Sequence, residues 1–123
     1  MRFRTIAACV PIMSAIGGGA FAQEGKQDFR LVNKTGYEIK EVYVSPSRSA
    51  DWEEDILADG VLGDLEARDI HFHRSATGCQ WDLKVVYSED SSSAIWAGID
   101  LCSVQKIVIH YDKDADKTSA DFD

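Results

Sequence analysis

The sequence predicts an all-β fold, a small antiparallel β-sandwich of six to seven strands with one short helix and one disulfide. Segments in which apolar and polar residues alternate are separated by turn residues, the pattern of strands that bury one face. Two cysteines remain after the first 22 residues, and they flank two such segments. About 100 residues make one domain with a modest core, which a disulfide often supplements at this size.

Six strands follow from the alternation. Between Trp81 and Tyr87 every second residue is apolar, and the same holds between Ile95 and Leu101. Tyr37, Ile39 and Tyr43 share one expected face, and Ile107, Ile109 and Tyr111 share another. Short strands with little helix favour two packed sheets. The expected strands are 28–33, 37–45, 68–74, 80–88, 94–101 and 104–111.

The segment 51–57 departs from this alternation and predicts a helix of one or two turns. Asp51 stands three residues before Glu54, the spacing of a capping box. Trp52 and Ile56 lie four residues apart, as residues on one helix face do. The helix would connect the second strand to the third.

The first 22 residues have the three parts of an export signal. Arg2 and Arg4 precede an apolar run, and the segment ends in Ala20-Phe21-Ala22, a small-x-small cleavage motif. The run is too short to span a bilayer. We therefore expect a periplasmic or secreted chain without a membrane anchor after cleavage, divided into a signal peptide at 1–22, a single domain at 23–111 and a fraying acidic tail at 112–123.

The chain is acidic, with 13 Lys and Arg against 21 Asp and Glu, a formal net charge of −8 at pH 7. Cleavage after Ala22 would remove two basic residues, and 11 minus 21 gives −10 for the remainder. Such a surface repels nucleic acid and anionic lipid and favours solubility. It leaves a cation, a basic protein or a small ligand as possible partners.

The two remaining cysteines, Cys79 and Cys102, are expected to form a disulfide. Cys9 would leave with the signal peptide, and the exported domain has no C-x-x-C motif. In an oxidising compartment two such cysteines are expected to form a disulfide rather than remain as free thiols. The bridge would join the strand that follows Cys79 to the strand that precedes Cys102.

An acidic segment next to an aromatic residue is the best candidate for an interaction surface: Asp51, Trp52, Glu53, Glu54 and Asp55. Carboxylates beside an indole could serve calcium, a sugar or a basic partner. In the alternative reading Trp52 plugs an open end of the sandwich and the acids solvate the helix.

Histidines offer a second candidate. His71 and His73 alternate with Ile70 and Phe72, so both imidazoles would lie on one face of the 68–74 strand and could begin a transition-metal site. The alternative is an exposed polar strand face, because a third ligand is not identifiable. In the tail, acidic residues at 112, 114 and 116 resemble the start of a calcium loop, but Lys117 occupies its glycine position.

Several stretches together resemble a family of small bacterial secreted proteins that has no established activity. The resemblance covers roughly residues 28–110 and implies export and a single domain, without assigning a role to any residue. It rests on Asn33-Lys-Thr-Gly36, Val42-Tyr-Val-Ser-Pro-Ser47, Trp52-Glu-Glu-Asp-Ile-Leu57, Cys79-Gln-Trp-Asp-Leu-Lys-Val-Val86 and Asp100-Leu-Cys102.

These observations favour an exported binding or envelope-associated module over an enzyme. The sequence contains no nucleophile elbow, no phosphate-binding loop and no dinucleotide fingerprint, and no cofactor is expected. The alternative is a metal-binding protein, which would use the acidic segment around Trp52 for calcium or His71 and His73 for a transition metal.

Overall fold

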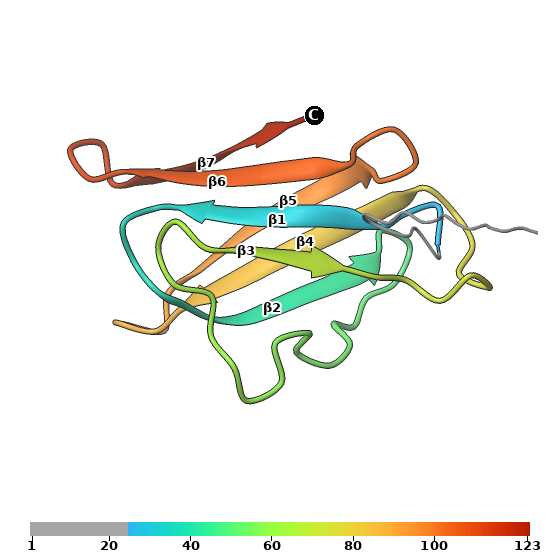
Figure 1. Ribbon diagram of the computed structural model, residues 1–123, viewed down its shortest axis with the longest axis horizontal. Coiled ribbons are helices and arrows are strands. Elements are labelled where there is room, and N and C mark those ends of the chain that lie inside the picture. The colour runs from blue at the N-terminus through green and yellow to red at the C-terminus, as the bar shows by residue number, and fades with distance from the viewer. Residues whose placement is uncertain (1–24) are drawn as a thin grey trace, which may run out of the picture.

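The computed structural model describes residues 25–123, so the expected signal peptide and Cys9 lie outside the described residues. Within this range the chain forms seven strands in two sheets and no α-helix (Figure 1). The strands are β1 (Phe29–Lys34), β2 (Ile39–Pro46), β3 (Ala67–Ile70), β4 (Gln80–Tyr87), β5 (Ser93–Asp100), β6 (Lys106–Asp112) and β7 (Lys117–Phe122). The predicted all-β sandwich with one disulfide is confirmed.

The larger sheet has the strand order β3-β1-β6-β7 and the smaller one β2-β4-β5. All paired strands are antiparallel except β1 and β6, which lie parallel at the centre of the larger sheet, with Arg30 opposite Lys106. In Figure 1, β4 and β5 run obliquely behind β1. Each sheet therefore has two edge strands, β3 and β7 in the larger and β2 and β5 in the smaller.

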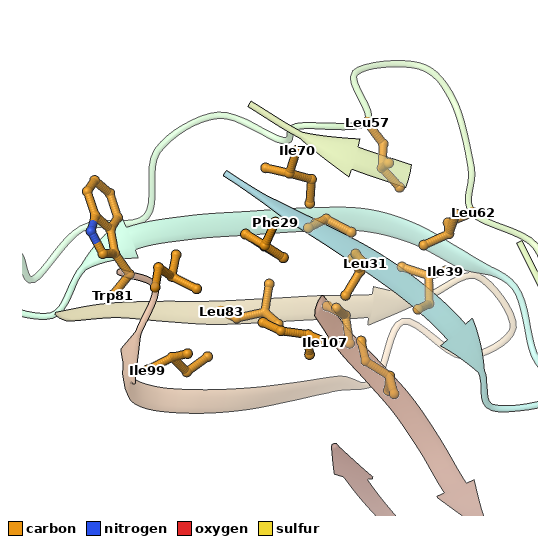
Figure 2. Packing of buried hydrophobic residues seen from close by; sticks show 14 of the residues in the cluster. Phe29, Leu31, Ile39, Leu57, Leu62, Ile70, Trp81, Leu83, Ile99 and Ile107 are labelled. Carbon is orange, nitrogen blue, oxygen red and sulfur yellow. The ribbon is translucent and has the colours of Figure 1, made fainter. Parts of the chain in front are cut away.

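The core lies between the two sheets and is built mainly from the alternate residues that the sequence pattern predicted (Figure 2). The pattern was wrong for the first half of β5, where Ile95 and Ala97 are exposed although Ile99 is buried, because the pairing with β4 shifts between Trp81 and Leu83. Leu31 and Ile107 contribute from the larger sheet, and Leu83 and Val85 contribute from β4. Burying one such side chain stabilises the fold by about 1.5 to 3 kcal/mol. Figure 2 shows Trp81 at one end of this row of side chains and Ile39 and Leu62 at the other.

The second strand contains an irregularity that changes which side chains face the core. Its pairing with β4 shifts between Ile39 and Glu41, as in a β-bulge. Beyond the shift Val42 is buried, whereas Tyr43 lies opposite Lys84 on the outer face. The prediction that Tyr37, Ile39 and Tyr43 share one face was therefore wrong for Tyr43, because one extra residue exchanges the two faces of a strand.

The helix predicted at 51–57 is absent, and this segment instead lies along the free edge of β2. The Asp55 carboxylate accepts hydrogen bonds from the backbone N–H groups of Val42 (2.8 Å) and Leu57 (3.0 Å). The Ile56 N–H donates to the Val42 carbonyl at 2.8 Å. Further along, Ile39 forms an isolated antiparallel bridge with Leu62. Covering a sheet edge satisfies otherwise open backbone groups, and this outweighs the weak local preference of so short a segment for a helix.

The tail predicted to fray at 112–123 forms β7, which pairs with β6 from Lys117 to Phe122. The turn before it is held by the Asp112 carboxylate, which accepts the N–H groups of Asp114 (3.0 Å) and Ala115 (3.3 Å). Pairing with β6 fills that strand's free edge, which compensates for the low hydrophobicity of the segment. The acidic spacing that resembles a calcium loop is therefore part of a hairpin turn.

The third strand is shorter than the predicted 68–74, since β3 ends at Ile70. Two residues later the Phe72 N–H donates to the buried Asp28 carboxylate at 2.7 Å instead of to a neighbouring strand. The Phe72 ring still reaches the core, where it packs edge-on against Trp81 with 4.9 Å between ring centroids. The chain thus leaves the sheet while keeping the predicted apolar contact.

The disulfide between Cys79 and Cys102 is present, with a Cα–Cα distance of 5.2 Å, and confirms the pairing predicted from the sequence. It joins the residue before β4 to the turn after β5, beside a hydrogen bond from the Leu101 N–H to the Cys79 carbonyl at 2.9 Å. Within residues 25–123 no helix has the length and hydropathy needed to cross a membrane.

Candidate functional site

Trp52, the centre of the predicted interaction segment, lies half-buried on the outside of the smaller sheet. Its ring is 6.5 Å from the Tyr43 ring, and the Lys84 ammonium lies 5.9 Å from its centroid. Trp52 therefore does not fill an open end of the sandwich, as one of the two interpretations of the sequence predicted. Trp81 occupies that position, with 7% of its surface exposed and its indole N–H donated to the Gly78 carbonyl at 3.1 Å.

The acids around Trp52 do not converge on a common point. Asp51, Glu53 and Glu54 are exposed, and Asp55 is engaged with the edge of β2. Among residues 25–123, the only three-residue group of His, Cys, Asp or Glu with ligand atoms within 4.8 Å of one another is Cys79, Asp100 and Cys102. Its two sulfur atoms are bonded to each other, whereas metals bind the free thiolate.

His71 and His73 follow the end of β3 and so do not share a strand face as predicted. Both are exposed. The His71 Nδ1 atom lies 3.3 Å from the buried Asp28 carboxylate, and the His73 Nδ1 atom lies 2.7 Å from the Ser75 hydroxyl. Each imidazole is thus engaged with a different neighbour, and the structure does not bring the two together with a third ligand.

A cleft that the sequence analysis did not anticipate opens at the end of the sandwich where β2, β5 and β7 begin and β4 and β6 end. Its volume is about 490 Å³. We call it the tyrosine cleft, because three of the four tyrosines in the chain line it. It is lined by Tyr37, Tyr87, Glu89, Asp90, Ser92, Ser93, Ala94, Ile95, Tyr111, Asp116, Lys117 and Thr118.

The three rings come from different parts of the fold and differ in exposure. Tyr87 is 8% exposed and belongs to the core cluster, while Tyr37 and Tyr111 are half-buried. Tyr37 and Tyr111 meet edge to face, with 5.6 Å between centroids and 79° between planes. The Tyr111 hydroxyl donates to the Asp116 carboxylate at 2.6 Å, and the Tyr87 hydroxyl lies 3.3 Å from the Thr118 hydroxyl. The wall of the cleft is therefore aromatic, and the hydroxyl groups of Tyr87 and Tyr111 have partners on the β6–β7 hairpin.

The cleft is negatively charged, and the pKa values of two of its phenols, Tyr87 and Tyr111, are raised. The hydrogen bond to Asp116 raises the pKa of Tyr111 to about 12. Burial raises the pKa of Tyr87 above its usual value. Hydrogen bonds from Ser92 lower the pKa of Asp90. Glu89, Asp90 and Asp116 against Lys117 give a formal charge of −2 among the lining residues.

A second groove, with a volume of about 460 Å³, continues from the tyrosine cleft along β5. Ile95 lines both cavities. The groove is otherwise lined by Trp96, Ala97, Gly98, Ile99, Asp100, Val104 and Phe122, so six consecutive residues of β5 from Ile95 onward border it. The two cavities thus occupy one side of the molecule, between the edge strands of the two sheets.

The sequence pattern placed the three tyrosines of the cleft in strands, and this was correct for Tyr87 in β4 and Tyr111 in β6, whereas Tyr37 lies two residues before β2. It could not show that these strand ends meet at one end of the sandwich, because that depends on the strand order. One feature of the sequence could have indicated the cleft. Tyr37, Tyr87 and Tyr111 each stand at one end of an alternating segment, next to a polar turn. A comparison of the chain with protein-family models, curated proteins and solved structures found no match.

Proposed function

We propose that this chain is an exported, non-enzymatic binding module whose tyrosine cleft takes a cationic group, an alkylammonium or a guanidinium. The observation that carries the proposal is the composition of the cleft. Tyr37, Tyr87 and Tyr111 share it with three carboxylates and a single lysine. Aromatic faces attract cations through their quadrupole, and nearby carboxylates add a long-range attraction of the same sign.

The raised pKa of Tyr111 supports binding over catalysis. A tyrosine whose pKa is near 12, as for Tyr111, stays protonated at neutral pH and is a poor general base. Its hydroxyl is also committed to Asp116. The ring remains as an uncharged, polarisable wall, which is what recognition of a cation requires.

Export is supported by the first 22 residues and by the disulfide. The N-terminal pattern is that of a cleaved signal peptide. The Cys79–Cys102 bridge suits an oxidising compartment, where such bonds persist. We propose the periplasm or the extracellular medium as the location.

The proposal is tested by titrating isotope-labelled protein with Nα-acetyl-lysine amide and, as a matched neutral ligand, Nα-acetyl-norleucine amide. We expect the cation to shift the amide resonances of the cleft with a Kd in the millimolar range, about 4 kcal/mol of binding free energy. The neutral analogue, which lacks the ammonium group, should cause much smaller shifts.

The chain supplies a matched control for the aromatic wall. Tyr111 and Tyr43 each donate their hydroxyl to a carboxylate, at 2.6 Å and 2.7 Å, but only Tyr111 lies in the cleft. Tyr111→Leu should weaken lysine-amide binding about fivefold, as loss of about 1 kcal/mol of cation–π energy implies, while Tyr43→Leu should leave it unchanged. Equal effects of the two substitutions, or equal binding of the two ligands, would refute a cation site in the cleft.

A further inference from the structure

We infer that the tyrosine cleft is one end of a longer site, in which an extended basic peptide of a partner protein adds as a fourth strand along the open edge of β5. The inference rests on the proposed function, because a Lys or Arg side chain of that peptide would occupy the cleft. Addition of a strand to a sheet edge is a common mode of peptide recognition.

The edge of β5 differs from the other edge of the same sheet. The edge of β2 is covered by the segment that carries Asp55, Ile56 and Leu62. Within residues 25–123 β5 pairs with β4 alone, so one of its two sides carries no strand. β5 is eight residues long, which is enough for an added strand of ordinary length.

The hydrogen-bonding pattern indicates which groups of β5 are open. The Tyr87 N–H donates to the Ser92 carbonyl at 2.8 Å, which makes these two residues a hydrogen-bonded pair. Bonded and non-bonded pairs alternate along an antiparallel ladder. Ala94 therefore turns its backbone groups toward β4, and Ser93 and Ile95 turn theirs toward the open side. An incoming strand would find the donors and acceptors that a β-ladder requires.

Apolar side chains flank this open edge. Ile95 and Phe122 are 55% and 42% exposed, and they are two of the four large apolar residues most exposed in the described chain. Both border the groove beside β5. An exposed edge strand with apolar flanks is a hazard that proteins usually block, so its persistence here fits a surface that is covered by a partner.

The charge of the site selects a basic occupant. Glu89, Asp90 and Asp116 lie at the cleft end, and Asp100 lies at the far end of the groove. A second copy of the chain would bring its own net charge of −8 against this side. An extended peptide with apolar residues and a lysine that reaches the cleft matches both the apolar flanks of the edge and the acidic residues of the cleft.

The test uses a soluble probe, the peptide acetyl-Thr-Val-Thr-Lys-Val-Thr-Val-amide, titrated into the labelled full domain. Only every second residue of an edge strand bonds its neighbour. Two methylated peptides are compared, one carrying N-methyl groups on the odd-numbered amides and the other on the even-numbered amides. In the peptide whose methylated amides face β5, binding should weaken at least tenfold. Methylation of the other set should change binding less than twofold. Replacing the lysine by norleucine should weaken binding about fivefold, and Tyr111→Leu should abolish that difference.

A pair of protein variants tests the same edge from the other side. Ile95→Pro removes the N–H that faces the open side and should weaken binding of the peptide at least tenfold, whereas Ile95→Thr keeps that N–H and should have a much smaller effect. Amide spectra of both variants check that the fold is retained. Because Ile95 also lines the tyrosine cleft, the comparison is between the two variants, which should bind the lysine amide equally well.

Three outcomes would overturn the inference. Equal effects of the two methylated peptide sets would refute strand addition, and continued binding of lysine amide would then leave the proposed function standing. Failure of both the peptide and the lysine amide to bind would refute the two proposals together. A chain that dimerises in sedimentation experiments and becomes monomeric in Ile95→Pro would show that a second copy occupies the edge.

Discussion

At the scale of single residues, the two half-exposed tyrosines bonded to carboxylates have one property in common. The hydrogen bond to Glu41 raises the pKa of Tyr43 to about 12, and the bond to Asp116 does the same for Tyr111. The phenol donates to the carboxylate only while it is protonated, so the fold favours the neutral form. Two surface contacts, one on each sheet, are therefore sensitive to alkaline pH.

This arrangement predicts a loss of stability between about pH 10 and 12. In the unfolded chain a tyrosine ionises near 10, and a folded-state pKa of about 12 means that the folded protein holds the proton longer. The stabilisation is complete below pH 10 and falls as the pH rises through 12. An absorbance titration should show phenols ionising near pH 12, and Tyr43→Phe and Tyr111→Phe should each remove one of them. Ionisation of Tyr111 near pH 10 would contradict the hydrogen bond.

The two tryptophans Trp52 and Trp81 should differ sharply in their contribution to stability. Trp81 is 7% exposed and packs against Phe72 in the core, so Trp81→Ala should cost about 3 to 5 kcal/mol. Trp52 covers only Tyr43 and the Lys84 side chain, so Trp52→Ala should cost about 1 kcal/mol. Urea denaturation measures both, and a larger loss for Trp52 would restore the plug reading.

At the scale of elements, the sequence predicted the strands that bury every second residue and missed the parts fixed by distant partners. Trp81 to Tyr87 shows a full alternation, and its strand was placed correctly. At 51–57 the spacing of Asp51, Glu54 and Ile56 suits a helix. The segment lies along the edge of β2 instead, because the Asp55 carboxylate accepts a hydrogen bond from that edge. At 117–122 the small and polar side chains gave no apolar pattern, and pairing with β6 decides their structure. The cleft was missed for the same reason, since strand order is set by long-range contacts.

A chain that ends at Asp112 tests whether β7 matters. Fraying would make residues 113–123 dispensable for stability. Because β7 pairs with six residues of β6, we expect the truncated chain to lose several kcal/mol and to aggregate through the exposed edge of β6. Denaturant midpoints measure the loss of stability and light scattering measures the aggregation. An unchanged midpoint would show that β7 contributes nothing to the free energy of unfolding.

The disulfide is the second element-scale prediction. It closes a loop with a sequence separation of 23 residues, which corresponds to about 3 kcal/mol in the chain-entropy model. Cys102→Ser should lower the unfolding free energy by this amount. The double variant Cys79→Ser with Cys102→Ser serves as the control, since it leaves no free thiol in residues 23–123. Two titratable thiols in the native, unreduced protein would contradict the bridge.

At the scale of the whole molecule, the larger sheet joins the beginning of the described chain to its end. β1 lies between β3 and β6, and its central residue Leu31 is opposite Ile107. Both side chains are fully buried. Neither β1 nor the core behind it is complete until β6 is in place, although both cysteines of the disulfide precede β6 in the chain.

A fragment that ends at Gln105 should therefore remain unfolded even though it retains β1 to β5. It lacks the parallel partner of β1 and the buried residues Ile107 and Ile109. Circular dichroism and amide dispersion would show a disordered chain. A cooperative unfolding transition in this fragment would mean that the smaller sheet with β1 and β3 is a stable unit by itself.

The parallel pairing of β1 with β6 also sets the order of events during biosynthesis. Contacts between distant segments form late, because the intervening chain must first be present and its loop closed. A nascent chain emerging from the ribosome cannot complete the environment of Leu31 until the segment around Ile107 has also emerged. The larger sheet thus closes only after nearly all of the described chain has been synthesised, so we expect its folding to follow synthesis rather than accompany it.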